Sequence, residues 1–102
     1  MKDYYIMLNR NSYLSTDWPH KYVFEVIGAI KETVDKPNKK FEARYFLGKN
    51  QKGQIRAISI NSLFDKKTSI SRYKLMRDNK RVHNKVSIQV IWNLVYDATV
   101  AG

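Results

Sequence analysis

Two apolar segments, on either side of a short loop bounded by glycines, constrain the fold of this chain most. Over 41–47 every odd-numbered residue is apolar. Gly48 and Gly53 enclose a basic loop, and an apolar run rich in isoleucine follows over 55–60. A period of two is typical of strands, and glycines between two such runs are typical of a hairpin. The sequence therefore predicts a β-hairpin around this loop.

The segment 20–34 has an ambiguous period. Its apolar residues recur at intervals of three and four from Val23 to Val34, and Pro37 follows shortly after the last of them. That spacing, with a proline beyond its end, favours a helix. The many β-branched residues of the segment and its internal Gly28 oppose a helix. We predict a helix here, with a strand as the alternative.

Two later segments are ambiguous in the same way. In 68–81, apolar residues spaced by three favour a helix with a basic face, although Tyr73 and Leu75 alternate as in a strand. In 86–97, every even-numbered residue from Val86 to Tyr96 is apolar, which predicts a long strand. Apolar residues at some odd positions leave a terminal helix as the alternative there.

These elements combine into one fold class. Residues 4–9 open with five consecutive apolar residues, which predicts a short central strand. The order strand, helix, strand, strand, helix, strand is the β-α-β-β-α-β, ferredoxin-like arrangement. We therefore expect a single small α+β domain over 1–102, an antiparallel sheet with one or two helices packed on one face. A mostly-β fold is the alternative.

The composition of the chain limits the cellular environment and the types of binding site that we expect for this protein. The chain has 102 residues and no cysteine, so it is long enough to bury a core and has no disulfide or thiolate metal site. No apolar run approaches the roughly 20 residues that span a bilayer, and the first ten residues lack a signal-peptide core. We expect a cytoplasmic protein without a membrane partner, a metal or a cofactor.

Positive charge is concentrated in the middle of the chain. Fifteen of the nineteen lysines and arginines lie in 36–85, which contains only three acids and so carries +12. The segments 1–35 and 86–102 each carry −1, and the whole chain carries +10. Such local asymmetry is typical of a protein with a polyanionic partner.

The charge pattern predicts a non-catalytic, nucleic-acid-binding protein, either a DNA-binding or an accessory module. Its bases would neutralise phosphates, with Arg72 and Arg77 the best candidates for bidentate contacts. If 68–81 were a helix, it would suit a major groove, and the hairpin loop Lys49 to Lys52 could instead follow a phosphate backbone or enter a groove as a β-ribbon. The predicted binding residues are Arg44, Lys66, Lys67, Arg72, Tyr73, Lys74, Arg77, Lys80 and Arg81.

Two other functions fit the same composition. The first is a small inhibitor or adaptor of the kind encoded by phages and plasmids, which would dock its basic face on an acidic protein or a ribonucleoprotein. The second is a metal-independent ribonuclease toxin that uses His20 and His83 as acid and base. Neither histidine has another ligand at metal-binding spacing, and the chain has no phosphate-binding glycine motif. We expect the protein not to be an enzyme.

Overall fold

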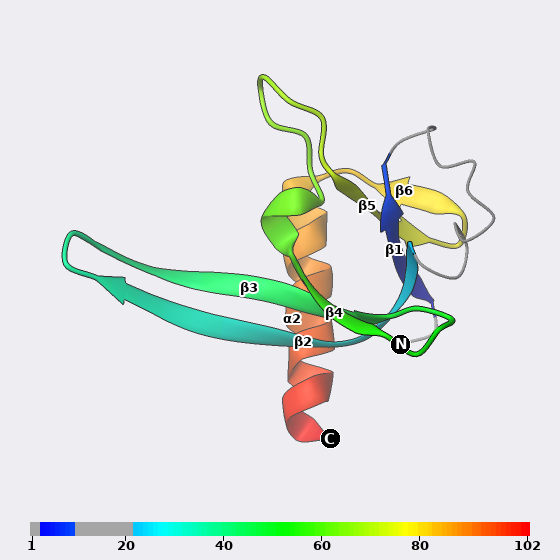
Figure 1. Cartoon of the computed structure of the whole chain (residues 1–102), viewed down its shortest axis with the longest axis horizontal. Coiled ribbons are helices and arrows are strands. Elements are labelled where there is room, and N and C mark those ends of the chain that lie inside the picture. Colours follow the sequence, from blue (N-terminus) through cyan, green and yellow to red (C-terminus); the bar gives the residue numbers. More distant parts are fainter. Residues whose placement is uncertain (1–2, 10–21) are drawn as a thin grey trace.

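Six strands form one sheet in the computed structural model, which describes residues 3–9 and 22–102. The strand order is β4-β3-β2-β1-β5-β6, and all neighbouring strands are antiparallel (Figure 1). The elements are β1 (Tyr4–Leu8), β2 (Val23–Lys36), β3 (Lys39–Lys49), β4 (Ile55–Ser59), the short 3-10 helix η1 (Ile60–Ser62), β5 (Tyr73–Arg77), β6 (Lys80–Val82) and the helix α2 (Lys85–Ala101). None of the described helices combines the length and the apolar composition needed to cross a bilayer.

The predicted hairpin and the predicted central strand are both confirmed. β3 and β4 pair in antiparallel register on either side of the loop that contains Gly53. Gly53 has a φ of 81°, a conformation that side chains with a Cβ rarely adopt. β1 lies between β2 and β5 and pairs with both, in agreement with its apolar residues on both faces.

The predicted helix over 20–34 is wrong for the described residues 22–34, which form most of β2. A β-bulge between Val26 and Gly28 explains the misleading spacing. It inserts Ile27 as an extra residue, so the buried positions are Phe24, Val26, Gly28 and Ala29 rather than strictly alternating ones. The buried side chains of β2 are therefore separated by two or three positions, and exposed apolar residues lie among them. Together these apolar residues resemble the period of a helix. Residues 20 and 21 lie outside the described residues.

The predicted helix over 68–81 is also wrong, because most of this segment belongs to the hairpin of β5 and β6. Asp78 and Asn79 form its two-residue turn with φ values of 50° and 62°. Positive φ at both central positions defines the turn type that best fits the twist of a hairpin, and aspartate and asparagine tolerate it. A turn of this kind interrupts any helix at these residues.

The predicted strand over 86–97 is wrong as well, because this segment is the helix α2. Asn84 caps it, since its side-chain oxygen accepts hydrogen bonds from the backbone N–H groups of Val86 and Ser87, at 2.8 and 3.3 Å. The buried residues, Ile88, Ile91, Trp92 and Val95, follow the helical spacing. The even-numbered apolar residues suggested a strand because α2 is apolar on its outer face too.

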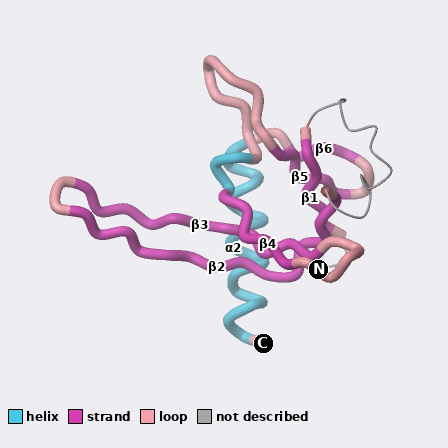
Figure 2. The backbone as a smooth tube through the Cα atoms, viewed as in Figure 1, coloured by secondary structure: helices cyan, strands magenta, loops and turns pink. Residues whose placement is uncertain are grey.

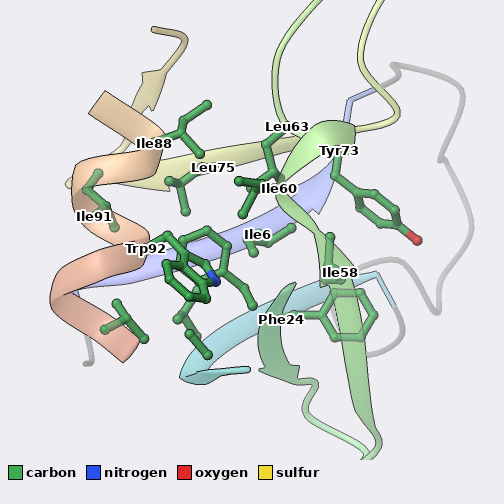
Figure 3. Packing of buried hydrophobic residues seen from close by; sticks show 14 of the residues in the cluster. Ile6, Phe24, Ile58, Ile60, Leu63, Tyr73, Leu75, Ile88, Ile91 and Trp92 are labelled. Atoms are coloured by element: carbon green, nitrogen blue, oxygen red, sulfur yellow. The ribbon is translucent and has the colours of Figure 1, made fainter. Parts of the chain in front are cut away.

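The described residues therefore form a mostly antiparallel β fold with one α-helix, and not the ferredoxin-like arrangement with two helices. The mostly-β alternative fits. α2 lies against one face of the sheet, and its buried side chains point toward Ile6, Leu75 and Phe24 in the core (Figure 3). Trp92 is in this core, as expected, and its indole N–H donates to the backbone carbonyl of Tyr45 at 3.0 Å.

Candidate nucleic-acid interface

The segment between η1 and β5 projects from the sheet as a narrow loop, which we call the 64–72 loop (Figure 2). Its two arms are joined near the tip. The backbone N–H of Lys66 donates to the carbonyl of Ser69 at 2.9 Å, and that of Ser69 donates back at 3.2 Å. Lys67 and Thr68 form the turn between them. The loop is thus a small hairpin, although it contains no strand.

A polar network fixes the base of this loop. The backbone N–H of Ser71 donates to Oδ1 of Asp65 at 2.7 Å. Nη2 of Arg81, on β6, donates to the hydroxyl of Ser71 at 2.8 Å and lies 3.4 Å from Oδ1 of Asp65. The side-chain amide of Asn9, just after β1, donates to the carbonyl and hydroxyl oxygens of Ser71 at 3.2 and 3.1 Å. The loop is therefore tied to two strands of the sheet.

Asp65 is the only acid of the 64–72 loop, and it is engaged in this network. The hydrogen bond from the backbone N–H of Ser71 is the main cause that lowers the pKa of Asp65, and the positive charge of Arg81 lowers it further. Because the pKa of Asp65 is lower in the folded than in the unfolded protein, its ionised carboxylate stabilises the fold. This stabilisation is present at pH values above the ordinary carboxyl pKa, and it is lost as the pH falls through the lowered pKa of the folded protein.

This network predicts the effect of Asp65→Ala. We expect the Ser71 amide to exchange with solvent on the order of tenfold faster, because its charged hydrogen-bond acceptor is gone. Asp65→Asn is the matched control, since it keeps an acceptor oxygen and should change the exchange rate much less. Amide exchange measured by NMR tests both variants. Equal exchange rates in Asp65→Ala and the wild type would contradict an anchoring role.

Three of the predicted binding residues lie together on the 64–72 loop. Lys66 and Lys67 are at its tip, and Arg72 is at its end, next to β5. All three side chains are exposed, and none forms an ion pair with an acid among the described residues. Oδ1 of Asp65 is bound by Ser71 and Arg81, although this side chain is 50% exposed, so the loop presents three bases to solvent beside one carboxylate that is already engaged.

Three more of the predicted residues lie on β5 and β6. Arg77 and Lys80 flank the turn of this hairpin and are exposed, whereas Lys74 is half-buried in β5. The guanidinium of Arg77 lies over the ring of Tyr4, with Cζ 5.7 Å from the ring centroid. The contact of Arg81 with the base of the 64–72 loop makes this hairpin a neighbour of that loop.

The other three predicted residues are engaged within the fold. Tyr73 is only 6% exposed and belongs to the core, where its hydroxyl accepts a hydrogen bond from Arg56 at 3.2 Å. Arg81 has a side chain 18% exposed and holds Asp65 and Ser71. Arg44 lies on β3, where it pairs with Glu42 at 3.0 Å and lies over the ring of Trp92. These three residues support the structure, and we do not include them in the candidate interface.

The structure adds a residue that the charge pattern did not single out. Ile70, on the 64–72 loop, is 75% exposed. A groove of about 310 Å³ runs along this flank of the loop, and its lining includes hydroxyl groups of Ser59, Ser62 and Ser69. Ile70 and the serines are uncharged and were therefore missed. The sequence feature that could have revealed this part of the loop is the hydroxyl-rich segment 68–71, which lies between two groups of bases.

Basic residues also mark the tip of the β2–β3 hairpin, which extends away from the body of the sheet (Figure 1). Lys36, Lys39 and Lys40 are all exposed there. Among the described acids, Asp35 pairs with Lys40 in the strand register and lies beside these lysines. This tip and the 64–72 loop each hold three bases and one acid, and they differ in that Oδ1 of Asp65 is bound by Ser71 and Arg81.

No protein-family model, curated protein or solved structure matches this chain. Among the described residues, no three side chains of histidine, aspartate or glutamate gather in a way that would hold a metal ion. His83 is exposed, and His20 lies outside the described residues. The fold and the candidate interface thus define a small antiparallel β protein whose sheet carries an anchored, basic loop.

Proposed function

We propose that this protein binds nucleic acid, and that the 64–72 loop is the main contact. The observation that carries the proposal is that the only acid of the loop is held by Ser71 and Arg81, while Lys66, Lys67 and Arg72 face solvent. Such bases release counterions from a phosphate backbone on binding. Because the loop is already anchored, binding orders fewer groups and so costs less conformational entropy.

The β5–β6 hairpin carries three further bases on two faces: Lys74 lies on the face away from α2, whereas Arg77 and its strand partner Lys80 lie on the α2 face. A helix in a major groove is no longer part of the proposal, because 68–81 is not helical. Narrow hairpins reach nucleic acid in a different way, by following the backbone or entering a groove as a ribbon. The hydroxyl groups of Ser59 and Ser69, beside the loop, are neutral donors that could reach phosphate oxygens, whereas Ser62 already donates to the carbonyl of Ser59. We propose a binding or accessory module rather than a catalyst.

The test is a fluorescence-anisotropy titration of labelled double-stranded DNA, single-stranded DNA and RNA of equal length. We expect a preference for one of the three and a steep loss of affinity between about 50 and 200 mM salt. Weak binding of equal strength to all three would contradict the proposal. It would favour the inhibitor or adaptor function, in which the same bases face an acidic protein or a ribonucleoprotein.

Ile70 supplies a test of the loop that is independent of charge. Because this side chain is largely exposed in the free protein, contact with a base or a sugar would bury apolar area. We expect Ile70→Ala to lower the affinity about threefold to tenfold and to leave the salt dependence unchanged. Ile55→Ala is the matched control, since Ile55 is also exposed but lies on β4, at the other edge of the sheet. An equal loss of affinity in both variants would exclude the loop as the contact.

A further inference from the structure

The groove on the flank of the 64–72 loop, which we call the loop groove, combines positive charge with apolar surface. Two bases, Lys66 and Arg72, line it, and the described residues of its lining include no acid. Its apolar side chains are those of Phe64 and Ile70. Phe64 is partly buried and packs against the core, whereas Ile70 is 75% exposed. The loop groove therefore has one apolar side chain that the fold holds in place and another that faces solvent.

The charged groups around the loop groove leave it positive. Lys85, at the start of α2, places its Nζ 5.3 Å from the centroid of the Phe64 ring, so a third base lies beside the lining. Asp65 contacts Ser71, which is part of the lining. Nη2 of Arg81 lies 3.4 Å from the carboxylate of Asp65 and offsets its charge. Such a surface attracts an anionic ligand.

The hydrogen-bond donors of the loop favour phosphate oxygens over a peptide backbone. The backbone N–H groups of Lys66 and Ser69 are paired with each other's carbonyls, and that of Ser71 is bound to Asp65. An extended peptide that paired with the loop as an added strand would find these donors already used. The loop groove offers side-chain donors instead, namely the charged groups of Lys66 and Arg72 and the hydroxyls of serines. Charged donors of this kind suit phosphate oxygens.

The apolar part of the loop groove points to an unpaired base beside that phosphate. Bases in a duplex are stacked on one another, whereas the bases of a single strand can turn outward and pack on aromatic and apolar side chains. The volume of the groove, about 310 Å³, is at the lower end of the range for small-molecule sites. This volume suits one nucleotide unit and is too small for a duplex.

We propose that the loop groove takes one unpaired nucleotide of a single-stranded nucleic acid. Its base packs on Phe64 and Ile70, and Lys66 and Arg72 hold the phosphates on either side of it. This inference rests on the proposed nucleic-acid binding and adds the form of the ligand. Because every base has a face that can stack, single-stranded DNA and RNA of any sequence satisfy the same contacts.

A comparison of ligands tests the form. Fluorescence anisotropy at about 0.1 M salt would compare a labelled DNA strand, the same strand annealed to its complement, RNA of the same sequence, and labelled polyglutamate. We expect both single strands to bind at least about tenfold more tightly than the duplex and the polyglutamate. A duplex that binds as tightly as the single strands, with a steep salt slope, would overturn this inference and leave nucleic-acid binding intact. Equally tight binding of polyglutamate would overturn both, in favour of an acidic protein partner.

Phe64→Leu isolates the contact with the base. Leucine keeps an apolar side chain against the core but removes the flat ring. We expect the affinity for the single strand to fall about threefold to tenfold, and the affinity for the duplex to stay unchanged. Phe41→Leu is the matched control, because Phe41 is also partly exposed and has a lysine over its ring, with Nζ of Lys39 at 5.1 Å. It lies on the β2–β3 hairpin, which extends in a different direction from the 64–72 loop (Figure 1). Equal losses in the two variants would overturn the proposal, and thermal unfolding verifies that both are folded.

Ile70→Tyr provides a gain of affinity, which a loss of folding cannot imitate. Because Ile70 is largely exposed, the larger side chain needs no space in the core. An aromatic ring at this position stacks on a base, so we expect the single strand to bind about threefold to tenfold more tightly. Val100→Tyr is the control, since Val100 is 67% exposed but lies near the C-terminal end of α2, and it should bring no gain. No gain for Ile70→Tyr, or an equal gain for the duplex, would overturn the proposed nucleotide site.

Discussion

Alanine at Lys66, Lys67 and Arg72 together is expected to lower the affinity for nucleic acid on the order of a hundredfold at about 0.1 M salt. Each base that contacts a phosphate releases about one counterion, so the slope of log K against log salt should fall by nearly three. The three side chains are exposed, and the one contact with the core among them is that of Arg72, whose guanidinium lies over the ring of Tyr73 at 5.6 Å. The fold should therefore be unchanged, as far-UV circular dichroism and thermal unfolding would verify.

The matched control removes the same charge elsewhere. Lys36, Lys39 and Lys40 lie at the tip of the β2–β3 hairpin, and their replacement by alanine also lowers the net charge by three. We expect this variant to lose much less affinity and to retain most of the salt slope. If both triple variants lose the same affinity, binding follows overall charge rather than the 64–72 loop, and the proposed interface is wrong.

Trp92→Ala is expected to lower the free energy of unfolding by about 3–5 kcal/mol. Trp92 is only 2% exposed and packs in the core between α2 and the sheet (Figure 3). The substitution would leave a cavity, and the carbonyl of Tyr45 would lose its hydrogen bond from the indole. The stacking on Tyr96, at 4.8 Å between ring centroids, would be lost too. Since domains of this size are typically stable by about 5–15 kcal/mol, this loss would remove between a fifth and all of the stability.

Urea unfolding followed by circular dichroism measures this loss, with Trp92→Phe as the control. Phenylalanine keeps an aromatic ring in the core but cannot donate to Tyr45, so we expect a smaller loss than for alanine. A loss below about 1 kcal/mol for Trp92→Ala would mean that α2 contributes little to the stability of the sheet. The core described here would then be wrong.

The local pattern of residues was sufficient to predict an element of secondary structure where that element packs against its neighbour in the sequence. The hairpin of β3 and β4 follows from alternation and a glycine-containing loop, and both features act over a few residues. The central place of β1 follows from its apolar residues on both faces. Asp78 and Asn79 carried a comparable local signal for the turn of β5 and β6, which the spacing of the surrounding apolar residues concealed.

The local pattern of residues gave wrong predictions where a partner far along the chain decides which side chains are buried. β2 is a strand because it pairs with β3 along nearly its whole length, and the bulge at Ile27 disguises its period. α2 is a helix that exposes Val86, Val90 and Leu94 as well as burying apolar residues, so the alternation of apolar residues wrongly indicated a strand. The roles of Arg81 and Tyr73 depend on neighbours far along the chain, since Arg81 holds Asp65 and Tyr73 packs in the core.

The amino-acid sequence by itself determined the +12 segment, the lack of cysteine, the β3–β4 hairpin and the central strand. Each of these depends on composition or on residues close together in the chain. Tertiary structure alone decided which bases face solvent, because exposure depends on what packs against each side chain. It separates Lys66, Lys67 and Arg72, which are exposed although Arg72 also lies over the ring of Tyr73, from Arg44 and Arg81, which form ion pairs within the fold. Charge counts in the sequence treat all of these residues alike.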